Sequence, residues 1–136
     1  MHWGVQWGGD PEDVRVTTSG VASVEDLDGM MRAVIADPQW RDGMKIMLDH
    51  TQTDWSVFGV GDLDRRAALV EDISDRIGRQ QVAFVVTGKL NQEIAKMLGA
   101  RLSDIGFVAK AFVSLDEARD WLREDPDLAT ADAKPR

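Results

Sequence analysis

One unbroken apolar segment constrains the fold more than any other part of the sequence. Residues 82 to 86 read Val-Ala-Phe-Val-Val, and Thr87-Gly88 follow directly. An apolar run of strand length without polar alternation is typical of a strand that is covered on both faces, as in a parallel sheet. Because parallel strands need long crossover connections, the segment predicts an α/β protein.

The segments around this run alternate between the strand period and the helix period. Further strands are predicted around residues 3–7, 14–18, 44–48 and 107–113, the first two as a hairpin. Apolar spacings of three and four predict helices over residues 24–37, 62–77, 91–100 and 115–122. We therefore expect a mainly parallel five-stranded sheet with an antiparallel edge strand and four helices.

Short polar and special residues predict where these helices begin and end. Ser23, Asp62 and Ser114 are placed as N-caps, because their side chains can accept the free N–H groups of a first turn. Pro38 stops the first helix near Asp37, and Gly78 can close the second. The inward residues expected of the third helix are Leu90, Ile94, Met97 and Leu98.

Composition excludes several classes of function. The 136 residues carry 24 acids against 16 bases and no cysteine. A net charge of −8 argues against a nucleic-acid partner, and the absence of cysteine excludes disulfides, thiolate metal sites and a Cys nucleophile. No apolar run approaches the ~20 residues that cross a bilayer, and the start lacks the regions of a signal peptide, so we expect no membrane insertion and a cytoplasmic location. One domain over residues 1–123 and a flexible acidic tail over 124–136 are predicted.

Three stretches carry a resemblance to a known family. They are Asp37-Pro38-Gln39-Trp40, Lys45-Ile46-Met47-Leu48-Asp49, and the ending from Phe112 to Leu122. With the element order, they resemble the SpoIIAA-like or STAS-like domains (sulfate transporter and anti-sigma-factor antagonist), many of them small bacterial proteins that are largely uncharacterised. The resemblance covers residues 1–123 and implies a SpoIIAA-like fold and a non-catalytic regulatory or binding role without a cofactor.

The family also implies a phosphorylation switch, which this sequence matches poorly. In anti-sigma-factor antagonists, a partner kinase phosphorylates a serine or threonine near the start of the helix after the Leu-Asp strand. The matching region here, residues 49–65, lacks an Asp-Ser-Ser-Gly or Asp-Ser-Thr-Gly sequence. Only Thr51, Thr53 and Ser56 offer a hydroxyl nearby, so a phosphorylation switch is the less favoured reading.

Residues 50–61 show no sustained period and are expected to form the longest loop. Trp55 and Phe58 in it either fold back on the core or line a pocket beside the turn at Gly88-Lys89. Lys89 is either a solvated lysine or, near a helix N-terminus, an anion ligand. Thr87-Gly88-Lys89 is not a phosphate loop, because position 83 is Ala and a leucine follows Lys89.

Asp49-His50, at the end of a predicted strand, allows a catalytic interpretation. Against it, His2 is the other histidine and lies on a predicted edge strand, so neither a catalytic set nor a metal site can be assembled. The simpler interpretation has Asp49 bonding to the backbone and His50 at the surface.

The main hypothesis is a non-catalytic module that binds a protein partner or small ligand through the segment after the third strand. Its expected binding residues are Asp49, His50, Thr51, Thr53, Trp55, Ser56, Phe58 and Lys89. The alternative is a carrier of an apolar or lipid-like ligand held near Met31, Met47, Trp55 and Phe58. A homodimer through the edge strand of Trp3 and Trp7 is a further expectation.

Overall fold

The computed structural model describes residues 1–77, 80–104 and 106–124, and it contains one five-stranded sheet. The strands are β1 (His2–Trp7), β2 (Val14–Val21), β3 (Lys45–Asp54), β4 (Gln81–Val85) and β5 (Val108–Phe112), and they lie in that order. β1 pairs antiparallel with β2, and every other neighbouring pair is parallel. The predicted mainly parallel sheet with an antiparallel edge strand is confirmed.

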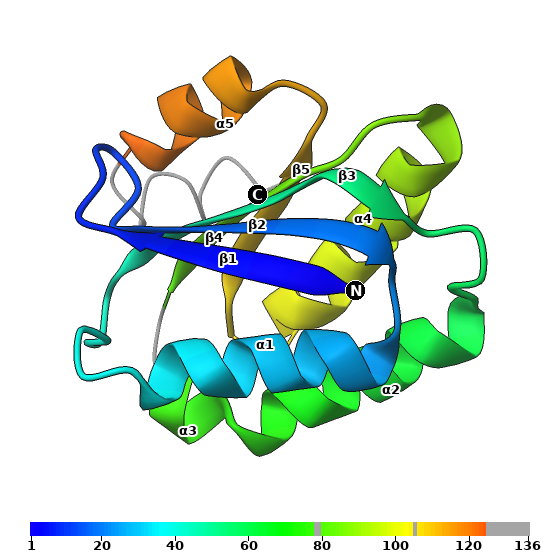
Figure 1. The fold of residues 1–136 in the computed structure, drawn as a ribbon, viewed down its shortest axis with the longest axis horizontal. Helices are drawn as coiled ribbons and strands as arrows, with labels where there is room; N and C mark the ends of the chain where they lie inside the picture. Colours follow the sequence, from blue (N-terminus) through cyan, green and yellow to red (C-terminus); the bar gives the residue numbers. More distant parts are fainter. Residues whose placement is uncertain (78–79, 105, 125–136) are drawn as a thin grey trace.

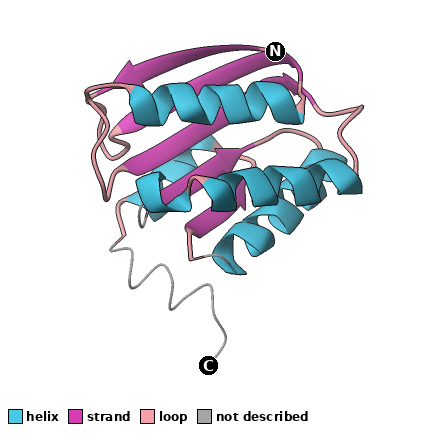
Figure 2. Ribbon diagram, turned by 90° about the horizontal axis from the view of Figure 1, so that it is seen from below, coloured by secondary structure: helices cyan, strands magenta, loops and turns pink. Residues whose placement is uncertain are grey.

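Helices cover both faces of this sheet (Figure 1). They are α1 (Val24–Ala36), α2 (Val60–Asp72), α3 (Ser74–Ile77), α4 (Lys89–Asp104) and α5 (Leu115–Leu122). The four longer ones match the four predicted helices, and α3 is a single turn at the end of the predicted second helix. We call the sheet face under α1, α2 and α4 the α1 face, and the opposite one the α5 face (Figures 1 and 2).

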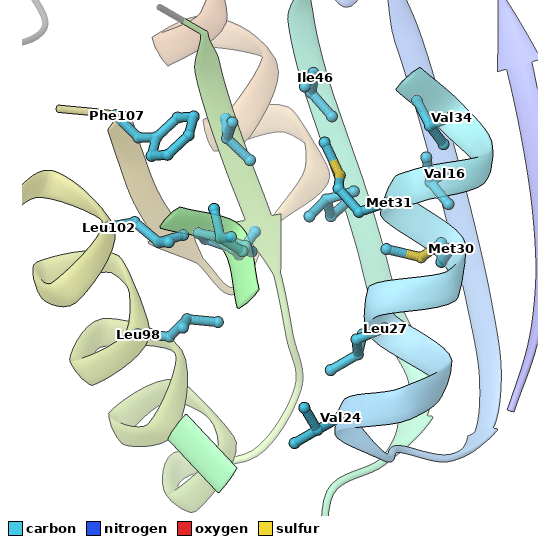
Figure 3. Close-up of a cluster of buried hydrophobic side chains, with 14 of the residues drawn as sticks. Val16, Val24, Leu27, Met30, Met31, Val34, Ile46, Leu98, Leu102 and Phe107 are labelled. Atoms are coloured by element: carbon cyan, nitrogen blue, oxygen red, sulfur yellow. The ribbon is translucent and has the colours of Figure 1, made fainter. Parts of the chain in front are cut away.

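Strand alternation divides the core between the two faces. On β3, Ile46 and Leu48 belong to the core of the α1 face, whereas Met47 belongs to that of the α5 face. Figure 3 shows the α1 face, where Leu27 of α1 and Leu98 of α4 approach the strands from two sides. Because helices cover both faces, the strands are apolar on both sides, which is what made β4 recognisable.

Two of the predicted helix starts are confirmed and one is wrong. The Ser23 hydroxyl accepts the Asp26 N–H at 3.1 Å, and the Ser114 hydroxyl accepts the Glu117 N–H at 3.3 Å. Asp62 is not the N-cap of α2, because the helix begins earlier, at Val60. From the third helical position its carboxylate accepts the N–H of the N-cap residue Gly59 at 2.8 Å, as in a capping box. The predicted closure at Gly78 and the tail beyond Glu124 lie outside the described residues.

The third strand and the fourth helix differ from their predicted bounds. β3 continues to Asp54 and α2 begins at Val60, so the loop predicted over residues 50–61 is confirmed for residues 55–59 and is wrong at both ends. The polar second half of β3 is held by pairing with β2, which also runs on, to Val21. Leu98 is buried as predicted, but Leu90 and Met97 are exposed, because the buried stripe of α4 runs through Ala95, Leu98 and Leu102 instead. None of the described helices is long and apolar enough to cross a membrane.

Candidate functional site

The second half of β3 carries a buried polar network on the α1 face. The Thr18 hydroxyl of β2 lies 2.5 Å from His50 Nδ1 and 2.5 Å from the Thr53 hydroxyl. All three side chains are buried, and His50 is only 3% exposed. The expectation of His50 at the surface is therefore wrong, because the strand that carries it continues under the helices instead of ending at Asp49.

Burial sets the protonation state of His50. Removal of the ring from water is the largest effect, the positive charge of Arg66 adds to it, and Asp49 opposes it; together they lower the pKa of His50 to about 3. The imidazole is thus neutral at physiological pH. Its Nδ1 is already engaged by Thr18, so within this network it acts as a hydrogen-bonding group.

Asp49 points to the other face of the sheet and has its own partners. It accepts hydrogen bonds from Arg15 Nη2 at 2.8 Å, from the Thr51 N–H at 3.1 Å and from the Thr51 hydroxyl at 2.7 Å. Burial alone would raise the pKa of Asp49, but the bonds from Thr51 and Arg15 outweigh it and keep the pKa below its usual value. The structure thus bears out the expectation that Asp49 bonds to the backbone, and it does not bring Asp49 and His50 together as a pair.

Trp55 and Phe58 take the first of the two predicted positions, and the cavity that they line does not include the turn at Gly88-Lys89. Both fold back on the core, at 7% and 6% exposure, and their rings meet edge to face at 5.2 Å. Trp55 also packs edge to face against His50 at 5.1 Å. The same three residues line a cavity that offers about 20 Å³ to the centres of water molecules, which is room for about one water.

Arg66 is the residue of this site that sequence reasoning missed. It lines the same cavity from α2, is 4% exposed, and makes no hydrogen bond or ion pair with another described residue. Burial lowers the pKa of Arg66 to about 10, an effect that the charge of Asp28 partly offsets. A signal existed in the sequence, because Arg66 follows Leu63 by three residues and precedes Val70 by four, the spacing of the buried stripe.

The remaining predicted residues, Lys89, Thr51 and Ser56, do not line this cavity. Lys89 is exposed at the first position of α4, and Thr51 is half-buried. The Thr87 hydroxyl donates to the Thr51 carbonyl at 3.4 Å, which joins β3 to the segment after β4. Ser56 is exposed, whereas Thr53 is buried, so Ser56 is more open to a kinase than Thr53.

The residues expected around a lipid-like ligand do not come together. Met31 lies in the core of the α1 face, as do Trp55 and Phe58, but Met47 lies in the core of the α5 face. The sheet itself separates them, because Met47 alternates with Ile46 and Leu48 along β3. In the parts of the chain that the structure describes, no three His, Asp or Glu side chains are grouped to hold a metal ion.

A solved structure supports the fold assignment. It is that of an uncharacterized protein of the DUF3478 family from Shewanella loihica PV-4, described as having a SpoIIAA-like fold. The two align with a TM-score of 0.56 over 89% of this chain and 92% of that one, at 16% sequence identity. This chain has a SpoIIAA-like fold. No protein-family model and no curated protein matches its sequence.

In this SpoIIAA-like fold, the carboxyl ends of β3 and β4 meet the solvent with apolar side chains. Val57 is 68% exposed, Val60 61% and Leu90 70%, and they are the three most exposed large hydrophobic residues in the described ranges. They come from two chain segments, the link to α2 and the start of α4, at one end of the sheet (Figure 1). We call Val57, Val60, Lys89 and Leu90 the carboxyl-end surface.

Proposed function

We propose that the chain is a non-catalytic module that binds a protein partner through the carboxyl-end surface. The observation that carries the proposal is that Val57, Val60 and Leu90, each more than 60% exposed, lie in the two segments that follow the carboxyl ends of β3 and β4, where α/β proteins place their ligands. Exposed apolar side chains that cluster mark interaction sites, whereas scattered ones need no explanation.

The charges at this surface favour a particular kind of partner. Lys89 is exposed beside Leu90 and makes no ion pair with any residue that the structure describes. A partner with apolar side chains and a carboxylate opposite Lys89 would complement it. A second copy of this chain is a poorer fit, because two copies that each carry a net charge of −8 repel one another.

Two features of the site support binding over catalysis. Asp49 and His50 lie on opposite faces of the sheet, and each already bonds to another side chain, Arg15 and Thr18 respectively.

The exposed hydroxyl of Ser56 lies in the link between β3 and α2, so regulation by phosphorylation is best sought there. Its N–H donates to Asp54 Oδ1 at 2.8 Å, which holds the turn that presents it.

The test compares two variants of one helix. Leu90→Gln alters the carboxyl-end surface, and Met97→Gln, which is also exposed on α4, is its matched control. Proteins captured from source-cell extract by the wild type are identified, and the purified partner is then titrated against each variant by calorimetry. We expect Leu90→Gln to weaken that binding about tenfold or more, with an unchanged melting temperature and unchanged binding by Met97→Gln. Equal binding by all three proteins would refute the proposed surface.

A further inference from the structure

Arg66 stands between two small cavities on the α1 face. The first lies beside His50, Trp55 and Phe58, and the second, of about 30 Å³ by the same measure, lies toward Val70. Both are also lined by Leu48 and Phe84. Arg66 thus lines two small cavities whose walls are mostly apolar.

Burial of the Arg66 guanidinium destabilises the fold unless a hydrogen-bond partner or an opposite charge compensates for it. Transfer of a charged group out of water costs several kcal/mol even after relaxation, and native proteins normally pair such groups. Arg66 Nη1 is fully enclosed without a hydrogen-bond partner among the described residues. Trp55 also lines the first cavity, and its Nε1 is likewise enclosed without a hydrogen-bond partner among the described residues.

Asp28 is the carboxylate whose charge acts on Arg66, but it already forms a hydrogen bond with another arginine. Asp28 Oδ2 accepts that bond from Arg32 Nε at 2.9 Å. Asp28 Oδ1 is enclosed and has no described partner, so Asp28 and Arg66 face each other's charge without forming a bond. Two enclosed donors, Arg66 Nη1 and Trp55 Nε1, therefore lack an acceptor among the described residues, beside a wall that is mostly apolar apart from His50 and Asn91.

We propose that the two cavities that Arg66 lines together bind one small organic carboxylate with a short hydrocarbon group. The carboxylate would accept hydrogen bonds from the Arg66 guanidinium and the Trp55 indole N–H, since a planar carboxylate matches the arginine fork. The hydrocarbon part would lie against Leu48 and Phe84, which line both cavities. The space available limits the ligand to a few heavy atoms, because the two cavities together hold only a few waters.

This site is independent of the carboxyl-end surface, since its donors are buried beneath it. The experiment titrates the ¹⁵N-labelled full chain with sodium propionate at constant ionic strength and follows the indole N–H resonance of Trp55, assigned with Trp55→Phe. We expect a saturable shift, and no saturable shift with propan-1-ol, which lacks the carboxylate. Arg66→Met should weaken propionate binding about tenfold or more, the loss expected for a charged hydrogen-bonded pair.

The matched control is Arg65→Met, which removes the neighbouring arginine of α2. Arg65 is exposed and bonds to Glu25 at 2.6 Å, outside the cavity, so this variant should bind propionate as the wild type does. The proposal is overturned if propionate gives no saturable shift, or if propan-1-ol or chloride gives the same one. It is also overturned if a folded Arg66→Met variant keeps the wild-type affinity.

Discussion

The two faces of the sheet are built from similar residues but packed differently. On the α5 face, Trp121 packs against Phe112 with ring centres 5.5 Å apart, and its carbonyl accepts Gln81 Nε2 at 2.9 Å. On the α1 face, Trp55 and Arg66 leave buried donors without partners beside unfilled space. The α5 face also carries buried polar side chains, but Asp49 bonds to Arg15 and Gln81 bonds to the Trp121 carbonyl. The difference teaches that the two faces satisfy their buried polar groups differently, because Arg66 Nη1 and Trp55 Nε1 on the α1 face have no such bond among the described residues.

The largest expected effect tests whether the α5 face is the tighter one. Trp121→Ala should lower the free energy of unfolding by about 3–5 kcal/mol, because it leaves a void in a well-packed cluster. Phe58→Ala, at the same 6% exposure, should cost about 3 kcal/mol or less, because a site beside a cavity and a loop can collapse. Urea denaturation measures both, and a greater loss in Phe58→Ala would contradict the comparison.

The next effect concerns the buried histidine of the α1 face. The pKa of His50 is about 3 in the folded protein against 6.5 for an unburied imidazole, so the unfolded chain binds an extra proton below about pH 6.5. The contribution of neutral His50 to the free energy of unfolding is complete above that pH and is lost as the pH falls toward 3. Between pH 7 and pH 5 the loss should be about 2 kcal/mol.

Chemical denaturation at a series of pH values measures this loss. The control is His50→Gln, which keeps a polar side chain but cannot take up a proton in this range. Its unfolding free energy should change much less between pH 7 and pH 5 than that of the wild type. An identical pH dependence in both proteins would mean that His50 is not the responsible group.

The smallest expected effect tests whether the N-caps of the helices on the two faces contribute equally to stability. Ser23→Ala on α1 and Ser114→Ala on α5 remove similar N-cap hydrogen bonds, of 3.1 and 3.3 Å. Each should lower the unfolding free energy by about 1 kcal/mol. Thermal melts of the two variants should therefore agree, and a clear inequality would show that the faces differ in their helix ends as well as in their packing.

The fold was predictable because its signals are local. The unbroken run around Phe84, the stripes of α1 and α5, and the capping serines each follow from residues close in sequence. The extension of β3 through His50 to Asp54 was not predictable in this way. It depends on pairing with β2, some thirty residues earlier, which gives polar residues a hydrogen-bonded place inside the protein.

The candidate site was predicted in part for the same reason. The sequence placed Trp55, Phe58 and Lys89 at one end of the sheet, since strand ends and turns are readable from glycines and periodicity. Arg66 was missed because a charged residue on an amphipathic helix is normally solvated, and only packing between helices shows it to be enclosed. Leu90 was expected inside, but it is exposed. The helix α4 starts at Lys89, two residues earlier than predicted, and Leu90 lies in its first turn.

The central claim is that Arg66 is held on the α1 face at the expense of stability. The most direct test is the free energy of unfolding of Arg66→Met, measured by urea denaturation without added ligand. The account predicts a value equal to or above that of the wild type, because the variant removes a buried charge while Asp28 keeps its bond to Arg32. A loss of about 3–5 kcal/mol would contradict it and would show that Arg66 forms a structural pair with Asp28.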